Sequence, residues 1–258
     1  MDLAKARKVV LEIAAKLKAQ GDPTRAREQE RYMKHVVRCH GLRMKDVDEF
    51  FKTESLLCRG QEETEDSGAL ALLLLQSEYQ EEKELGIRLW KLGDEELRAS
   101  VFEKGLVTGW AICDSACSRI LREGCKKDSG WRERVSRWGT GATNLWTVRA
   151  SCVAFICTLN DEVCRTAALV AADYAISNSP FKQERFVQLG IGWLVREIGV
   201  VDAGQANHFI RQHLGLFSAE GLRYATEKLS PTERDIWRGD WKQLNGAPKG
   251  DGKRRKTE

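Results

Sequence analysis

The stretch Leu106-Val-Thr-Gly-Trp110-Ala-Ile-Cys-Asp114-Ser-Ala-Cys-Ser-Arg-Ile120-Leu121 sets the pattern of this chain. Its apolar side chains recur at steps of three and four residues, which predicts a helix. Trp110 and Asp114 are four residues apart, so this helix presents an indole and a carboxylate side by side. Such a pair attracts a flat, cationic ligand, because the ring face and the carboxylate both favour positive charge. By spacing alone, a core tryptophan beside a solvent-facing or capping aspartate is the more common arrangement.

The same periodicity fills the rest of the chain. No segment alternates apolar and polar residues as a strand does, so the fold class we expect is all-α. Short breaks between helices and the lack of a heptad register favour a HEAT-like helical-repeat solenoid. The expected helices lie near residues 2–19, 23–38, 44–53, 67–76, 78–92, 94–104, 107–123, 129–138, 142–158, 160–176, 180–198, 202–213, 218–229 and 231–242.

Prolines and composition define the ends of these segments. Asp22-Pro23, Ser179-Pro180 and Ser230-Pro231 each combine an N-cap residue with proline, which predicts three helix starts. We interpret residues 1–245 as a single helical-repeat domain. Residues 246–258 are rich in Gly, Lys and Arg and predict a disordered basic tail. Its Lys253–Lys256 cluster is equally compatible with a nuclear signal, a phosphate contact or no role.

Composition limits the compartment and the chemistry. The chain has 258 residues, 42% apolar and 31% charged, which is typical of a soluble globular protein. The longest apolar run, Ala69–Leu75, is too short to cross a membrane, and the charged N-terminus does not resemble a signal peptide. We therefore expect a cytoplasmic or nuclear protein without membrane contact. The eight cysteines include no Cys-x-x-Cys pair, so we expect free, buried thiols and no metal.

The net charge of +4 is unevenly distributed. Residues 61–84 carry eight acids against one lysine, whereas residues 119–149 carry eight basic residues against three acids. This basic stripe indicates a surface for a polyanion, although a solvated helix face is an equally good interpretation.

Four stretches, in this order, resemble one family. They are Arg31-Tyr-Met-Lys-His35, Trp110-x-x-x-Asp114, Leu145-Trp-Thr-Val-Arg149-Ala-Ser151 and Leu189-Gly-Ile-Gly-Trp193-Leu-Val-Arg-Glu197. Together they are similar to the AlkD-like DNA alkylation-repair glycosylases, all-helical proteins of HEAT-like repeats. The similarity runs from about Arg31 to Trp237. It implies a monomeric enzyme of base excision repair that needs no cofactor. Its substrate would be duplex DNA with positively charged alkylated purines such as 3-methyladenine and 7-methylguanine.

The resemblance also implies the site. Trp110 and Trp193 match the tryptophans that flank the lesion's deoxyribose, Asp114 matches the catalytic carboxylate, and Arg149 matches a DNA-contacting arginine. Family members often carry a tryptophan and an acid where this chain has Gly109 and Ala111, and paired arginines where it has Val148-Arg149. These departures leave every catalytic group in place.

The expected chemistry is simple. A purine alkylated at N3 or N7 is already cationic, so it leaves without a general acid, through an oxocarbenium-like sugar. Asp114 would stabilise this cation and orient water, and the two tryptophans would hold the sugar. We expect the basic residues to line a concave DNA-binding face: Arg119, Arg122, Lys126, Lys127, Arg132, Arg134 and Arg137.

Two other functions fit the same fold. One is a non-catalytic protein that recognises the structure of DNA by shape and charge. The other is an α-solenoid scaffold for protein partners, which would carry an apolar or acidic groove around Trp110. The sequence alone does not give the preferred lesion, the tolerance of bulky adducts or the oligomeric state.

Overall fold

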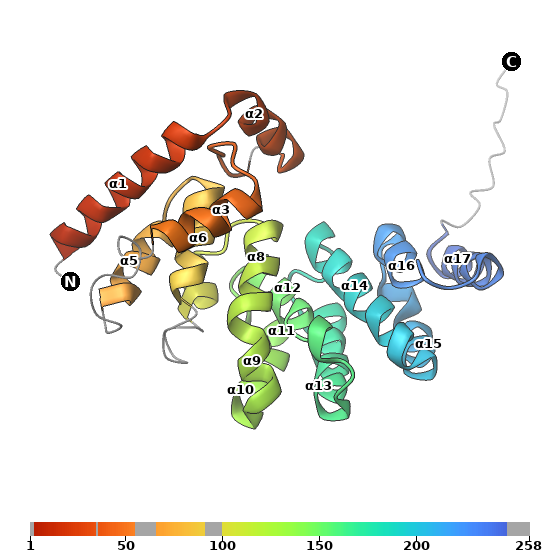
Figure 1. The fold of residues 1–258 in the computed structure, drawn as a ribbon. Coiled ribbons are helices and arrows are strands. Elements are labelled where there is room, and N and C mark those ends of the chain that lie inside the picture. Colours follow the sequence, from red (N-terminus) through yellow and green to blue (C-terminus); the bar gives the residue numbers. More distant parts are fainter. Residues whose placement is uncertain (1–2, 35, 55–65, 91–99, 247–258) are drawn as a thin grey trace, which may run out of the picture.

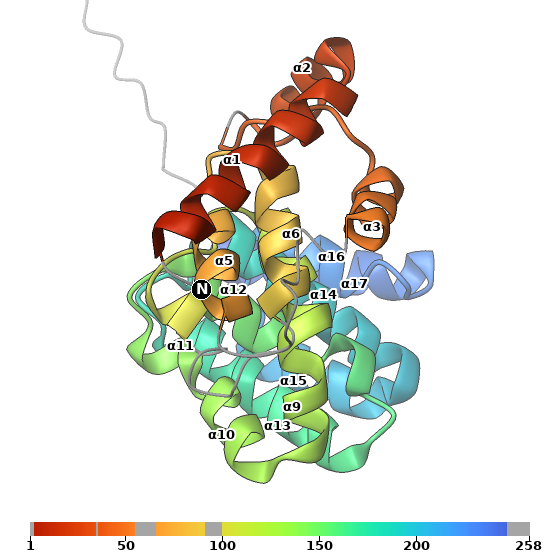
Figure 2. The ribbon, with the colours of Figure 1, turned by 60° about the vertical axis from the view of Figure 1, so that its left-hand side comes forward.

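The computed structural model describes residues 3–34, 36–54, 66–90 and 100–246 (Figure 1). Helices follow one another along a curved array, and within these residues the single β-type pairing is an isolated bridge between Arg38 and Tyr79. The all-α, helical-repeat architecture expected from the periodicity is therefore confirmed. One continuous apolar core runs from Ile13 to Ala225. Turned by 60°, the ribbon shows α1 and α2 projecting at one end of the array (Figure 2).

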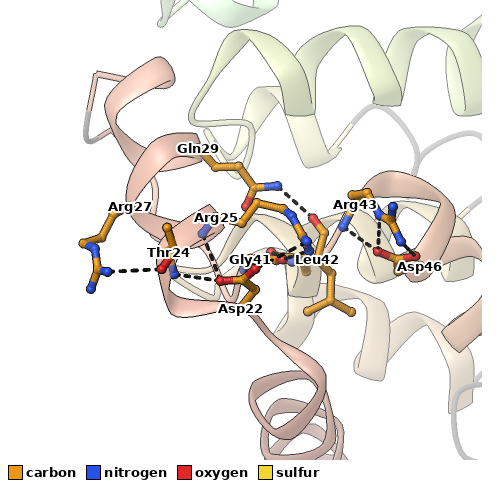
Figure 3. A network of polar contacts seen from close by, with 10 residues as sticks. Asp22, Thr24, Arg25, Arg27, Gln29, Gly41, Leu42, Arg43 and Asp46 are labelled. Carbon is orange, nitrogen blue, oxygen red and sulfur yellow. Dashed lines mark hydrogen bonds and ion pairs between the residues drawn. The ribbon is translucent and has the colours of Figure 1, made fainter.

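The N-terminal part begins with helices whose starts follow the sequence. Asp22 caps α2 by accepting hydrogen bonds from the backbone N–H groups of Thr24 and Arg25, and Pro23 is its first residue. Figure 3 shows this cap. The helices are α1 (Leu3–Gln20), α2 (Pro23–Tyr32), α3 (Met44–Thr53), α5 (Asp66–Leu75) and α6 (Gln80–Trp90). The helix expected over residues 23–38 is too long, because α2 ends at Tyr32 and Lys34 adopts a left-handed conformation with φ 56°.

Side chains fix the loop that follows α2. Arg25 and Gln29 donate hydrogen bonds of 2.8 Å each to the carbonyls of Gly41 and Leu42 (Figure 3). Gly41 has φ 92° and lies so close to Asp22 that a Cβ there would be 2.1 Å from its carbonyl oxygen. Only glycine fits this left-handed, crowded position.

Two buried acids of α6, Glu81 and Glu82, hold the same loop. The Glu81 carboxylate accepts hydrogen bonds from the backbone N–H groups of His40, Gly41 and Leu42 at 2.9, 2.8 and 3.1 Å. Glu82 lies 2.8 Å from His40 Nε2. Glu81 and Glu82 thus serve as internal acceptors that tie the loop after α2 to α6.

The stretch around Trp110 forms one continuous helical segment. It consists of α8 (Trp110–Ala116), a π-helical turn (Cys117–Leu121) and α9 (Arg122–Lys127). From the predicted stripe, Cys113, Cys117, Ile120 and Leu121 are buried here, and Trp110 is half-buried. The Arg122 N–H donates to the Cys117 carbonyl, five residues before it, which is the hydrogen bond of a π turn.

The C-terminal half continues the array (Figure 1). Its α-helices are α10 (Ser129–Ser136), α11 (Trp138–Gly141), α12 (Leu145–Val153), α13 (Glu162–Asp173), α14 (Arg185–Val201), α15 (Ala203–His213), α16 (Ala219–Ala225) and α17 (Pro231–Asn245). The helix start expected at Ser179-Pro180 is wrong. A π turn (Tyr174–Asn178) prolongs α13, Ser179 Oγ accepts from the N–H of Phe181, and α14 begins only at Arg185.

The remaining expectations concern the cysteines, the membrane, the single domain and the tail. The described cysteines are free thiols, and all but Cys157 are buried. None of the described helices has the length and apolar character that crossing a membrane requires. The single-domain interpretation of residues 1–245 stays a prediction. The tail lies outside the described residues from residue 247 onward.

Candidate functional site

A cleft of about 740 Å³ opens where the end of α2 faces α8, α12, α14 and α16. All four residues assigned by resemblance, Trp110, Asp114, Arg149 and Trp193, line it. The aromatic side chains of the cleft are Tyr32, Trp110, Trp146, Phe186, Trp193 and Tyr224. Aromatic rings around one carboxylate form a site for a flat or cationic group.

Trp110 and Asp114 lie on the first turns of α8. Gly109, with extended backbone (φ −161°, ψ 161°), is the N-cap that turns the chain into this helix. The Tyr32 ring meets the Trp110 indole edge-on, with 5.7 Å between ring centroids. Tyr32 is 71% exposed and lines the cleft, so it forms part of the rim above Trp110.

Asp114 forms a bidentate ion pair with Arg149 of α12. Arg149 Nε and Nη2 donate to Asp114 Oδ1 and Oδ2, each at 2.9 Å, and Nη1 donates to the carbonyl of Phe186 at 2.8 Å. The Arg149 side chain is 6% exposed and that of Asp114 is 19% exposed. A carboxylate has about four acceptor sites, so each oxygen keeps one free beside the arginine.

The surroundings set the charge states of this pair. Burial raises the pKa of the Asp114 carboxyl, whereas the hydrogen bonds and positive charge of Arg149 oppose that shift. For Arg149, burial works against the charged form, but the Asp114 hydrogen bonds and negative charge outweigh it and raise the pKa. A guanidinium does not deprotonate in proteins, so its charge favours the ionised form of the facing carboxylate.

A second buried network holds α8 from its other side. Ser115 Oγ donates to Glu84 Oε2 at 2.8 Å, and Arg88 Nη1 donates to the same oxygen at 2.8 Å. Arg88 also donates to Asp48 of α3 at 2.9 and 2.6 Å. Asp114, next to Ser115, therefore sits on a helix anchored to α6 and α3.

Glycines of α14 create the space for the pair and for Trp193. A Cβ on Gly190 would lie 3.2 Å from Arg149 Cγ, so glycine here lets the arginine pass toward Asp114. A Cβ on Gly192 would lie 2.5 Å from the Gly221 carbonyl oxygen, so α14 and α16 touch at this point. These two approaches place Trp193, half-buried, on the wall of the cleft.

Cations surround the cleft, and apart from Arg149 they are not those expected to contact DNA. Within the described part of the chain, no carboxylate pairs with Arg31, Lys34 or Arg223, all of which line the cleft. Arg185 also lines it and is paired with Glu220 at 2.6 and 2.7 Å. The unpaired cations at the rim, Arg31, Lys34 and Arg223, make its entrance positive.

Of the eight basic residues of the predicted stripe, Arg149 lines the cleft, and the seven that we expected to line a concave DNA-binding face do not. They lie on the π turn, α9, α10 and the turn after α10, away from α2 (Figure 1). Arg119 is 3.5 Å from Asp48, Arg134 is 2.8 Å from Glu103 and Arg137 is 2.9 Å from Glu133. Lys127 and Arg122 lie 3.2 and 3.9 Å from Glu123, and Arg132 donates to the Cys125 carbonyl. Lys126 is exposed. DNA contacts by these residues stay a prediction, but the cleft itself is lined by other cations.

Sequence reasoning assigned no role to Trp146, although this residue lines the cleft. Its ring packs on Phe186 with 5.3 Å between centroids. Trp146 precedes Arg149 by three residues, and that spacing places both on one face of α12.

Among the described residues, no group of three or more His, Cys, Asp or Glu side chains is placed to hold a metal ion.

Fold and site together define a helical-repeat protein with an aromatic cleft built around a paired carboxylate. The chain belongs to the DNA alkylation repair enzyme family, whose sequence model matches residues 13–229. A solved structure, described as a predicted DNA alkylation repair enzyme from Enterococcus faecalis, has a similar fold with a TM-score of 0.67. At 16% identity the alignment covers 82% of this chain and 97% of that one. No curated protein sequence matches the chain significantly. The family inferred from the four stretches is confirmed.

Proposed function

We propose that this protein is a DNA glycosylase. It would release positively charged alkylated purines, of the 3-methyladenine and 7-methylguanine type, from duplex DNA by hydrolysing the N-glycosidic bond. The observation that carries the proposal is the shared cleft: Asp114, Trp110 and Trp193 come from two helices and line one space. The family match supports a role in DNA repair, and the cations at the rim suit a phosphodiester backbone.

In this proposal Asp114 acts on the sugar. Cleavage of the C1′–N bond leaves positive charge on the deoxyribose, and a carboxylate stabilises that charge more in the transition state than in the substrate. The acceptor sites that Arg149 leaves free on the two oxygens would orient the attacking water. The base leaves as a neutral purine, so no general acid is required.

The aromatic side chains would hold the deoxyribose. The faces of Trp110 and Trp193 contribute cation–π attraction of about 0.5–2 kcal/mol each to the developing cation. Arg31, Lys34 and Arg223 would contact phosphates and fix the register of the duplex without reading its sequence.

The test compares wild type with Asp114→Asn in the release of methylated purines from alkylated duplex DNA. Asp240→Asn, an exposed aspartate on α17 outside the cleft, is the matched control. We expect Asp114→Asn to reduce release to background while duplex binding and the thermal unfolding midpoint show a folded protein. Asp240→Asn should behave as wild type.

Undiminished release of methylated purines by Asp114→Asn would refute the catalytic role assigned to the Asp114 carboxylate. Salt-sensitive duplex binding without release by wild type would instead establish the non-catalytic DNA-binding alternative. A failure to bind duplex DNA at all would favour the protein scaffold.

A further inference from the structure

A second groove lies between α16 and α17, and its α17 wall lies beyond the part of the chain that the family model matches. Its volume is about 520 Å³. The family match ends at residue 229, and α17 begins at Pro231. Figure 1 shows α16 between α14 and α17. The α16–α17 groove is therefore formed by a helix that this chain carries in addition to the matched region.

The charge of this groove is strongly positive. Its lining contains four basic residues, Arg223, Arg234, Arg238 and Lys242, and one acid, Asp235. Asp235 pairs with Arg238. In the described ranges, no carboxylate pairs with the other three cations. A concave surface with three unpaired cations favours a polyanion.

Helical spacing arranges the three basic residues of α17, including the paired Arg238, in a row. Arg234, Arg238 and Lys242 follow one another at steps of four residues, so they share one face of α17 and span about 12 Å. Phosphates of one DNA strand follow at about 3.4 Å along the axis, so the row extends over three to four of them.

Tryptophans hold α17 in this orientation. Trp241 Nε1 donates to the carbonyl of Phe217 at 2.8 Å. The Arg211 guanidinium lies over the Trp237 ring, 5.9 Å from its centroid. Both indoles pack against the apolar core. The basic row is thus supported by contacts that do not involve the cations themselves.

Arg223 connects the two sites, because it lines both the cleft and the α16–α17 groove. We propose that this groove binds the phosphodiester backbone of the same duplex whose damaged nucleotide occupies the cleft. This inference rests on the proposed function for the orientation of the duplex. The contact is independent of sequence and of damage, because phosphates carry no base information.

The experiment measures binding of undamaged duplex DNA between about 50 and 200 mM salt, so that base release is not needed for the result. The groove variant is Arg234→Gln/Arg238→Gln/Lys242→Gln in the full chain. The matched control is Lys5→Gln/Arg7→Gln/Lys8→Gln, which removes three exposed cations from α1, outside both sites. Thermal unfolding checks that the variants are folded.

In the proposed complex the exposed Arg238 exchanges Asp235 for a phosphate, so the triple substitution removes three phosphate contacts and lowers the slope of log affinity against log salt by about 2.7. Over this fourfold salt range, wild type should therefore lose about 40-fold more affinity than the groove variant. The control should keep the wild-type slope. An unchanged slope in the groove variant, or an equal change in the control, overturns the inference. If wild type releases no base but the groove variant alone loses salt dependence, the glycosylase proposal fails and the groove inference stands.

Discussion

Arg149 of α12 donates two parallel hydrogen bonds of 2.9 Å to the carboxylate of Asp114 of α8. The acid that is expected to stabilise the sugar cation is therefore a structural partner as well. Experiments can separate the catalytic role of Asp114 from its structural role. Removal of Arg149 leaves the Asp114 carboxylate unpaired, whereas removal of the carboxylate leaves the Arg149 guanidinium unpaired.

Arg149→Met should destabilise the fold. It leaves the Asp114 carboxylate mostly buried without its counter-charge, which costs about 3 kcal/mol in the free energy of unfolding. The double variant Asp114→Leu/Arg149→Met should recover most of this loss, because two apolar side chains replace both charges. Denaturant unfolding of the two single variants and the double variant measures the coupling. A purely additive result would contradict a strong pair.

Arg149 should also set the pH dependence of base release. Burial raises the pKa of Asp114 above its ordinary 3.8, and Arg149 opposes this. Release requires the carboxylate form, so it should fall as the pH drops through this pKa. Arg149→Gln removes the opposing charge, and the acidic limb should move to higher pH. Single-turnover release against pH measures it. An unmoved limb would show that another group controls the profile.

The two glycines of α14 should respond differently to alanine. In Gly192→Ala the new methyl meets the Gly221 carbonyl, which cannot move without shifting α16, so we expect a loss of about 1–3 kcal/mol. In Gly190→Ala the methyl meets the Arg149 side chain, which can yield. Alanine favours the helix over glycine by about 1 kcal/mol, and this gain in stability offsets the strain from the contact. Because the displaced Arg149 no longer holds Asp114 in place, base release should fall. Thermal unfolding and base release together separate the two cases. Equal stability losses would contradict this reading of the contacts.

Local sequence rules found the part of the site that lies on one helix. The four-residue spacing of Trp110 and Asp114 placed both on one face of α8, and both line the cleft. The Asp114–Arg149 pair joins residues 35 positions apart, so its geometry depends on how α8 packs against α12. The space that Gly190 leaves for the arginine depends on α14 in the same way.

Charge patterns were the weakest guide. The sequence shows the acids of α6 only as part of a negatively charged segment, but Glu81 is buried because three backbone N–H groups of a distant loop point at it. A proline after serine predicted a helix start at Pro180, but a π turn extends the preceding helix and places this proline in a turn. Neither the distant backbone donors of Glu81 nor the π turn before Pro180 can be recognised from the local sequence pattern.

The positions of the cations lead to a test of the DNA-binding face. Arg31 and Lys34 line the cleft without a carboxylate partner among the described residues, whereas Lys126 and Lys127 lie on α9, away from it. We expect Arg31→Gln/Lys34→Gln to lower the slope of log affinity for duplex DNA against log salt by about 1.8. Lys126→Gln/Lys127→Gln removes the same charge, so it controls for long-range attraction and should change the slope little. A larger effect at Lys126 and Lys127 would instead support the stripe predicted from the sequence, and would move the duplex toward α9.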